Sequence, residues 1–292
     1  MALLACGLWG SAFSAVKTGF ALLHIHTMGS QILFAGYRFF LAGIMTLVMI
    51  SIMEKRLVTI KASSIPRVFM QGILQTTIQY VCFYIGLSNT TAARGSIING
   101  SNAFFSILAA HFLTKNEKLS LKKVIGCVIG FAGIVIVNLN DGGGLSGSFR
   151  FMGEGLILLC SASYGISCVT MKMISDRETP NAITAYQFLL GGGALIAIGL
   201  AAGGDVGEFT LASSLLLVYL SLLSTVAFCL WANLLKYNPV GRIAIFGFSI
   251  PVFGVFMSAI FLGENVVHMT TIVSLILVSA GIVVVNKSPA VK

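Results

Sequence analysis

The sequence predicts an all-α integral membrane protein with ten transmembrane helices, arranged as two inverted five-helix repeats. Composition is the first observation: 9% of the residues are charged, 57% are apolar and the mean hydropathy is +0.97. A water-soluble domain carries about 25% charged residues. The second is a series of ten apolar stretches, each near the ~20 residues that span hydrocarbon as a helix. The third is a set of residues that recurs in the second half of the chain.

The ten apolar stretches are separated by short connections. They lie at 2–23, 29–52, 67–86, 92–113, 122–139, 153–174, 181–202, 212–235, 241–262 and 267–286. The longest connections are 53–66 and 140–152, so no soluble domain fits between the spans. Continuous hydrophobicity excludes outer-membrane strands, which alternate over about ten residues. The first span is not expected to be a cleaved signal, because no basic segment precedes it and nine spans follow.

Aromatic, basic and polar residues recur about 150 residues apart. The recurring pairs are Trp9 and Tyr164, Gly10 and Gly165, Lys17 and Lys172, Arg38 and Gln187, Arg94 and Arg242, Ser101 and Ser249, Phe105 and Phe253, and Glu117 and Glu264. The offsets run from 155 down to 147, so the register changes only by loop length. We therefore assign residues 1–140 to a first repeat, 141–152 to a linker and 153–292 to a second repeat. Such duplication is typical of secondary transporters.

Basic residues are concentrated on one side of the predicted spans. If the spans alternate in direction, one side carries 13 of the 18 Lys and Arg residues, and the other carries only Arg94 and Arg150. The positive-inside rule then places both termini in the cytoplasm. Because five spans per repeat is an odd number, the second repeat enters from the opposite face and the repeats are inverted. This distribution accounts for the net charge of +9 without a nucleic-acid partner.

Several short motifs, taken together and in order, resemble a known family. They are Leu8-Trp9-Gly10-Ser11 with Lys17, the stretch from Tyr37 to Gly43, Leu262-Gly263-Glu264-Asn265, and the stretch from Ser279 to Asn286. The chain resembles the EamA family of the drug/metabolite transporter superfamily over its whole length. The resemblance implies a ten-helix basket, in which the first four helices of each repeat surround a central cavity and the fifth braces the outside.

The fourth predicted span departs from that family pattern. It reads Ser101-Asn102-Ala103 where the family usually has proline, whereas the second repeat keeps Pro251. We therefore expect this span either to be straighter or to rely on Asn102 for a local backbone hydrogen bond.

Polar side chains recur at helical spacing on one face of two predicted spans. They are Gln71, Gln75, Gln79 and the adjoining Tyr80 in the third span, and Asn99, Asn102 and Ser106 in the fourth. Hydrocarbon offers such groups no partner. They either line a cavity or bond between helices, which contributes ~0.6 kcal/mol per bond. We expect Gln75, Gln79, Tyr80, Asn99 and Asn102 to line a substrate cavity.

Basic residues within the predicted spans are further candidates. Arg38 lies in the third turn of its span, where it either fixes the fold through carbonyls and tyrosines or holds an anionic group of a substrate. Its counterpart is the neutral Gln187, so only the first repeat presents this charge. Lys17 either snorkels to the interface or faces the cavity, whereas we expect Lys172 to snorkel. Lys17, Arg38 and Gln187 join the predicted substrate-binding set.

Trp9 and Tyr164 complete that set because both lie near the middle of their spans. Tryptophan and tyrosine ordinarily form a belt at the membrane interface, and Trp231 fits this explanation. Rings at mid-span instead suit stacking on an amphipathic or aromatic metabolite.

These features favour a secondary transporter in the cytoplasmic membrane, moving a small metabolite through a central cavity by alternating access. The resemblance implies an amino acid or related compound, often exported. An intramembrane enzyme is one alternative, since the residues around Ser249 superficially resemble a rhomboid nucleophile site and His268 follows in sequence. A channel or signalling scaffold is the other. We expect no enzymatic activity. The expected partners are a small-molecule substrate and membrane lipids, and the expected oligomeric state is a monomer or homodimer.

Neither a cofactor nor a metal is expected, because the six cysteines all fall inside spans and form no Cys-x-x-Cys pair. None of the nine acidic residues falls at the membrane midplane by the assigned spans. We therefore predict a facilitator or exchanger without an obligatory proton, with a preference for substrates that bear a carboxylate. The alternative is proton coupling through Lys17.

Overall fold

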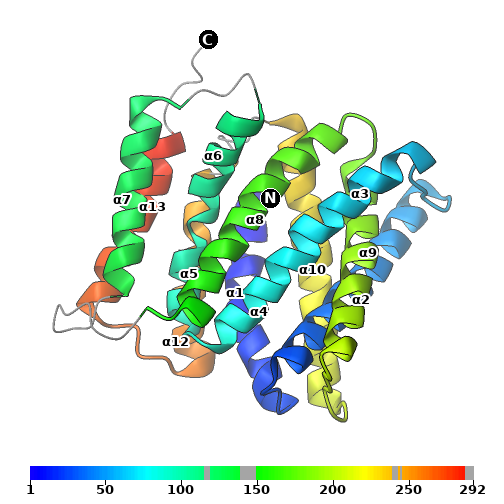
Figure 1. The fold of residues 1–292 in the computed structure, drawn as a ribbon, viewed down its shortest axis with the longest axis horizontal. Coiled ribbons are helices and arrows are strands. Elements are labelled where there is room, and N and C mark those ends of the chain that lie inside the picture. Colours follow the sequence, from blue (N-terminus) through cyan, green and yellow to red (C-terminus); the bar gives the residue numbers. More distant parts are fainter. Residues whose placement is uncertain (115–118, 139–148, 239–242, 244, 287–292) are drawn as a thin grey trace.

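The computed structural model describes residues 1–114, 119–138, 149–238, 243 and 245–286 (Figure 1). Within these ranges the chain is helical and contains no strand. Predicted residues Glu117 and Arg242 lie outside the described residues, as does most of the 141–152 linker.

The first half of the chain forms seven α-helices and two short irregular helices. They are α1 (Ala2–Leu22), α2 (Met28–Glu54), the 3-10 helix η1 (Ala62–Ser64), α3 (Ile65–Gly72), the π-helix η2 (Ile73–Ile78), α4 (Gln79–Ser88), α5 (Ala92–Asn99), α6 (Asn102–Leu113) and α7 (Leu121–Val137). The second half forms the π-helix η3 (Phe151–Gly155), α8 (Leu156–Ile174), α9 (Pro180–Ala201), α10 (Leu211–Tyr237), the 3-10 helix η4 (Ile245–Phe248), α12 (Ser249–Leu262) and α13 (Met269–Asn286).

Five helical segments of the described chain are long and apolar enough to cross a membrane. They are Met28–Glu54, Ala92–Leu113, Phe151–Ile174, Pro180–Ala201 and Leu211–Tyr237. Two shorter apolar helices, Phe246–Leu262 and Met269–Val285, accompany them. Most of the long helices are only about half buried within the protein, as expected when their other face meets lipid.

Threonine side chains mark the start of four helices. The hydroxyls of Thr27, Thr91, Thr179 and Thr210 accept hydrogen bonds from backbone N–H groups in the first turns of α2, α5, α9 and α10. These bonds satisfy N–H groups that have no partner within the helix. The caps fix where each helix begins, and so which turn carries Arg38 on α2 and Asn99 on α5.

The fourth predicted span contains a short interruption between α5 and α6. The break falls at Gly100 and Ser101, where the N–H groups bond the carbonyls of Ile97 and Ile98, three residues back. Oδ1 of Asn102 accepts no hydrogen bond from the described residues, so it does not supply the local bond expected of this side chain. A tight turn, without proline, therefore separates α5 from α6 and turns Asn99 and Asn102 toward the protein centre.

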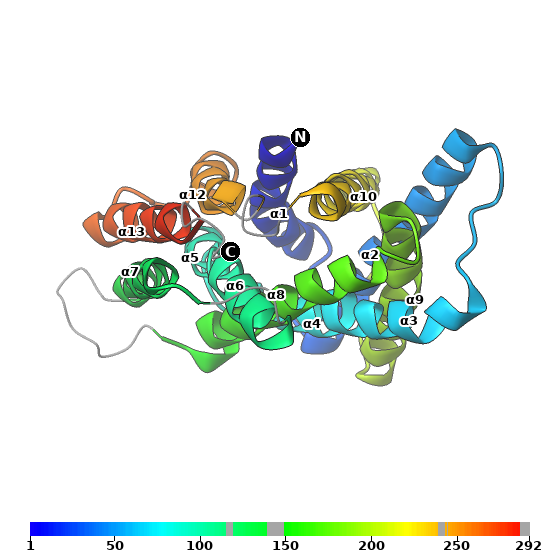
Figure 2. The ribbon, with the colours of Figure 1, turned by 90° about the horizontal axis from the view of Figure 1, so that it is seen from above.

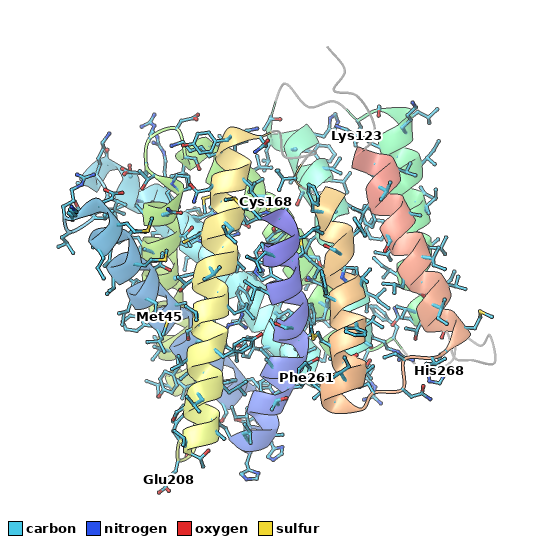
Figure 3. The ribbon with its side chains drawn as sticks, turned by 180° about the vertical axis from the view of Figure 1, so that it is seen from behind. Met45, Lys123, Cys168, Glu208, Phe261 and His268 are labelled. Carbon is cyan, nitrogen blue, oxygen red and sulfur yellow. The ribbon has the colours of Figure 1, made fainter. Side chains whose placement is uncertain are left out.

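The helices surround a central space. Seen from above, α1, α10 and α12 form one row, α4 and α8 lie opposite them, and α5 and α6 lie between (Figure 2). The pair α7 and α13 closes one end, and α2 with α9 closes the other. Figure 3 shows that Lys123 lies at one end of the helices, whereas Glu208 and His268 lie at the opposite end.

Glycine residues allow the close contacts within this arrangement. A β carbon on Gly10 of α1 would lie 2.5 Å from the β carbon of Phe253 on α12, and one on Gly165 of α8 would lie 2.8 Å from that of Phe105 on α6. Side chains at these positions would force the helices apart. Small residues at such crossings are typical of membrane helix packing.

Candidate central cavity

A cavity lies at the centre of the helices, with about 40 Å³ available to the centres of water-sized molecules. Seven of the ten predicted site residues line it, namely Trp9, Arg38, Gln79, Tyr80, Asn99, Asn102 and Tyr164. They come from α1, α2, α4, α5, α6 and α8, so residues far apart in sequence meet here. Phe13, Phe83, Phe228 and Ile250 supply the apolar wall.

A second, smaller chamber of about 20 Å³ adjoins the first. The two chambers share Asn99, Asn102 and Tyr164, and the second is also lined by Cys168 and Trp231. Because Cys168 and Trp231 lie toward the C-terminal ends of α8 and α10, the second chamber extends toward that end of the protein. The two chambers together thus form a narrow path, lined in part by polar side chains, along part of the length of the helices.

Arg38 is the charged group of the central cavity, and its side chain is buried with 1% exposed. Its Nε donates to the backbone oxygen of Leu220 at 3.3 Å and to Oγ of Ser224 at 3.0 Å. Its Nη1 donates to the hydroxyl of Tyr84 at 3.2 Å. The guanidinium carbon also lies 4.8 Å from the ring centre of Phe39, a cation–π contact.

These partners of Arg38 are all neutral. The ion pairs of the described residues join Lys17 to Glu264 and Arg56 to Glu54, and neither includes Arg38. Nη2 makes no hydrogen bond to the described residues. An uncompensated buried charge costs several kcal/mol. The bonds to Leu220 and Tyr84 match the predicted role of fixing the fold through carbonyls and tyrosines. The free Nη2 leaves room for the other predicted role, holding an anionic group of a substrate.

Other polar atoms of residues that line the two chambers have no hydrogen-bond partner among the described residues. They are Nε1 of Trp9, Oε1 of Gln79 and Oδ1 of Asn102 in the first chamber, and Nε1 of Trp231 in the second. A buried polar atom without a hydrogen bond costs about 1–3 kcal/mol. The cavity therefore offers two donors and two acceptors to a ligand or to water.

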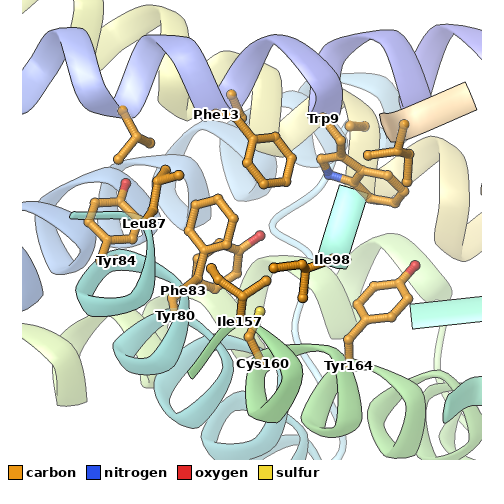
Figure 4. Close-up of a cluster of buried hydrophobic side chains, with 14 of the residues drawn as sticks. Trp9, Phe13, Tyr80, Phe83, Tyr84, Leu87, Ile98, Ile157, Cys160 and Tyr164 are labelled. Atoms are coloured by element: carbon orange, nitrogen blue, oxygen red, sulfur yellow. The ribbon is translucent and has the colours of Figure 1, made fainter. Parts of the chain in front are cut away.

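Aromatic side chains, among them Trp9, Phe13 and Tyr164, gather beside the cavity (Figure 4). The ring of Trp9 lies 6.3 Å from that of Tyr164, 5.2 Å from Phe228 and 5.0 Å from Trp231, all in edge-to-face arrangements. Trp9 and Tyr164 thus line the cavity, as expected from their mid-span positions. Trp231, interpreted from the sequence as a belt residue, is instead buried against Trp9. The position of Trp231 near the end of its predicted span favoured the belt interpretation, so its place in the cavity wall was not predicted.

Aromatic rings also close the cavity toward the end that carries Lys17. Phe13 and Phe83 meet at 5.1 Å, and beyond them the ring of Phe20 lies 5.8 Å from that of Tyr84. A wider vestibule of about 460 Å³ lies on the far side of this layer, lined by Lys17 and Phe20 among others. In this conformation, rings separate the vestibule from Arg38.

The remaining three predicted residues lie outside both central chambers. Oε1 of Gln75 accepts a 2.8 Å hydrogen bond from Gln71, whose amide also donates to the backbone oxygen of Ser167. Gln75 therefore belongs to a hydrogen-bond network between α3, η2 and α8. This corresponds to the alternative in which these amides bond between helices instead of lining the cavity. Gln187 is fully buried and neither of its amide atoms has a hydrogen-bond partner. Lys17 lies in the vestibule.

Glu264, which belongs to a family motif but was not among the predicted site residues, contacts Lys17 in the structure. Its carboxylate lies 3.9 Å from Nζ of Lys17 and accepts hydrogen bonds from the backbone N–H groups of Ala92 and Ala93, at 2.8 and 2.9 Å. It thus joins the loop after α12 to α1 and to the N-terminus of α5, where a negative charge is favoured. Nothing in the residue spacing links position 264 to position 17, because the contact depends on how distant helices pack.

Comparison with protein families identifies the chain. Residues 1–139 and 151–287 match the model of the EamA-like transporter family. This chain belongs to the EamA-like transporter family. The EamA-like chain is therefore a multi-pass membrane protein, and the match agrees with the motifs around Trp9, Arg38 and Glu264.

Similar proteins carry the same general description. An uncharacterized transporter from Archaeoglobus fulgidus is 27% identical over 261 residues, which cover 88% of this EamA-like chain and 87% of the relative. The uncharacterized transporter YvbV of Bacillus subtilis is 25% identical over 291 residues, covering 98% and 90% of the two chains. A solved crystal structure shares the fold, with a TM-score of 0.71 at 16% identity over 97% of this chain and 95% of the other.

These relatives point to transport in general rather than to an enzyme. The Ser249 alternative relies on His268 as the nearby base, and the structure places these two residues at opposite ends of α12. Ser249 opens α12 and donates to the backbone oxygen of Phe246, whereas His268 follows the other end of that helix. A helix of this length separates its ends by ~20 Å.

Proposed function

We propose that this EamA-like protein is a secondary transporter that moves a small carboxylate-bearing metabolite across the cytoplasmic membrane by alternating access. An amino acid or a related compound, carried outward, is the substrate class we favour. The observation that carries this proposal is Arg38, a buried cation with neutral partners on the wall of a central cavity. A carboxylate at Nη2 would supply the missing counter-charge.

The unpartnered atoms define the rest of the proposed substrate. Oε1 of Gln79 and Oδ1 of Asn102 would accept hydrogen bonds from an ammonium or hydroxyl group, and Nε1 of Trp9 would donate one. The surrounding rings would pack against an apolar body. A site that hydrogen-bonds its substrate in this way discriminates strongly against analogues that leave its polar groups unpaired.

The helix contacts support ten spans in two inverted repeats. In this interpretation, α3, η2 and α4 together form the third span, and α5 and α6 form the fourth. The contact of Gly10 with Phe253 then corresponds to that of Gly165 with Phe105, because the repeat exchanges both partners. The helices α2 and α9, and likewise α7 and α13, each pair with their own counterpart. A two-fold axis in the membrane plane produces this pattern.

The same symmetry supports alternating access. Phe13 and Phe83, which close the cavity toward Lys17, correspond by the repeat offsets to Cys168 and Trp231, which line the second chamber. Corresponding positions at the two ends of the substrate pathway are thus arranged differently: one pair closes the cavity and the other pair lines a chamber. Exchange of the two arrangements would close the second chamber and open the vestibule. With both termini cytoplasmic, the present conformation is closed to the outside.

We propose that transport has no obligatory proton. Glu154 accepts hydrogen bonds from Thr90 and from the backbone of Arg150, and Glu264 binds the start of α5, so both carboxylates are held at helix ends. An imposed pH gradient should therefore not drive accumulation in proteoliposomes. Accumulation that follows the gradient and collapses with a protonophore would contradict this.

A ligand screen by thermal shift tests the substrate class. Amino acids and organic anions should raise the melting temperature of the purified protein, and amides of the same compounds should not. Arg38→Gln should abolish the shift by carboxylates. Stabilisation by neutral amides that equals that by carboxylates, in both proteins, would contradict the assignment.

A further inference from the structure

The outer vestibule has the features of a binding site of its own. It is a hollow of about 460 Å³ between the C-terminal ends of α1 and α4 and the N-terminal end of α2. Lys17, His26, Gln31 and Asn89 contribute polar groups to its wall, and Phe20 contributes an aromatic ring. It lies on the far side of the aromatic layer from Arg38, so a ligand could occupy it while the central cavity is closed.

Lys17 retains hydrogen-bonding capacity toward this hollow. Its ion pair with Glu264 is long, at 3.9 Å, and the Glu264 carboxylate is already bonded to the N–H groups of Ala92 and Ala93. The side chain of Lys17 is 25% exposed, and its ammonium donates no hydrogen bond to the described residues. An ammonium has three donors. Glu264 thus balances part of the charge and leaves those donors available to an anion.

Gln31 provides an independent observation at the same place. Its side chain is 5% exposed and lines the vestibule, yet Oε1 has no hydrogen-bond partner in the part of the chain that the structure describes. The first residue of α2, Met28, also lines the hollow, so the positive end of that helix lies beside it. A group that brings both a negative charge and a hydrogen-bond donor would satisfy Lys17 and Gln31 together.

A single ring layer separates this hollow from the central site. Lys17 and Phe20 are one turn apart on α1, and the ring of Phe20 lies 5.8 Å from that of Tyr84. The hydroxyl of Tyr84 in turn accepts the hydrogen bond from Arg38. Movement of the Phe20 and Tyr84 rings would therefore open a path between the vestibule at Lys17 and the central cavity at Arg38.

We propose that the vestibule is a second binding site for the carboxylate of the transported molecule, with Lys17 as its charged ligand and Gln31 as its polar partner. This inference rests on the proposed function. Substrate passes between Arg38 and Lys17 when the ring layer opens, and the vestibule holds it before release or after entry. The carboxylate thus meets a cation on each side of the layer.

Binding of benzoate to the purified full-length protein tests the two sites separately. Equilibrium dialysis with radiolabelled benzoate counts all bound anion. Tryptophan fluorescence reports only the central site, because the two tryptophans of the chain, Trp9 and Trp231, both line the central chambers. Benzamide is the neutral control ligand. Lys172→Gln is the matched control variant, because Lys172 is the repeat counterpart of Lys17 at the opposite end.

The wild type and Lys172→Gln should each bind two benzoates per chain. Lys17→Gln should bind one and keep the fluorescence change, whereas Arg38→Gln should bind one and lose it. Gln31→Leu, measured with labelled 4-hydroxybenzoate, whose hydroxyl can donate to Oε1 of Gln31, should weaken the same component as Lys17→Gln, and serves if the latter does not fold. Unchanged stoichiometry in Lys17→Gln and Gln31→Leu, or wild-type binding that depends on Arg38 alone, would overturn the second site. Absence of an Arg38-dependent fluorescence change would instead contradict the proposed function.

Discussion

Arg38 uses two of its side-chain nitrogens for hydrogen bonds within the protein and leaves the third without one among the described residues. Nε and Nη1 hold α10 and Tyr84, and Nη2 is left for a ligand. Arg38→Lys keeps the charge but replaces a planar fork by a single point donor. We expect the lysine variant to lose at least about tenfold in transport, equivalent to ~1.4 kcal/mol, nearly as much as Arg38→Ala. Uptake into proteoliposomes measures this, and wild-type activity of the lysine variant would show that charge alone matters.

Asn102 tests whether the unpartnered atoms serve a ligand. Asn102→Ala removes an amide whose oxygen has no partner in the protein, so the folded yield should change little. Loss of one hydrogen bond, worth ~1 kcal/mol, should weaken substrate binding roughly fivefold. The control is Asn138→Ala, since Asn138 also has an unpartnered oxygen but lies at the end of α7, outside the cavity. Equal transport defects in the two variants would place Asn102 in helix packing.

At the scale of helices, glycine contacts fix the distance between α1 and α12 and between α8 and α6. Gly10→Ala and Gly165→Ala should each lower stability by about 1–3 kcal/mol, because overpacking forces helices apart. Gly193→Ala is the control, since a β carbon there meets no atom within 4 Å. Melting temperatures of the purified variants test this. A tolerated Gly10→Ala alongside a destabilising Gly193→Ala would contradict the described packing.

The sequence predicted helices well where one physical signal dominates. Continuous hydrophobicity gave 2–23 and 181–202, and the described helices are Ala2–Leu22 and Pro180–Ala201. It did not predict the break at Gly100, because that turn is set by local backbone hydrogen bonds within an apolar stretch. The π-helix Ile73–Ile78 was missed for the same reason: helical spacing of Gln71, Gln75 and Gln79 assumes uniform geometry.

For the whole molecule, the proposed topology can be checked by labelling. Both termini are expected in the cytoplasm, with Ser63 on the same side and Asn89 outside. A membrane-impermeant thiol reagent applied to intact cells should label a cysteine at Asn89 and spare one at Ser63. The parent chain is the control, because five of its six cysteines are buried and Cys82 is partly buried. Labelling of both positions from outside would contradict the inverted repeats.

The site was predictable to the extent that polar groups in apolar helices need a partner or a cavity. This reasoning found Arg38, Gln79, Asn99 and Asn102, which the structure brings together. It did not separate them from Gln75, whose partner Gln71 lies one turn away, because the same spacing suits a cavity wall and a side-chain hydrogen bond.

Contacts between helices far apart in the chain could not be predicted from the sequence. Trp231 meets Trp9 and Glu264 meets Lys17 only because α1 packs between α10 and α12. No local signal in the chain encodes which distant helix becomes the neighbour. Those two contacts define the wall of the cavity and the charge of the vestibule, so the tertiary packing decides which polar residues can meet a substrate.

Counterflow in proteoliposomes tests the central claim most directly. Vesicles containing the wild-type protein are loaded with an unlabelled carboxylate that stabilises it, and a trace of the labelled compound is added outside. A carrier with alternating access accumulates the label transiently, saturates with substrate and loses this flux in Arg38→Gln. A flux that rises linearly with concentration, shows no transient accumulation and is unchanged in Arg38→Gln would contradict the account.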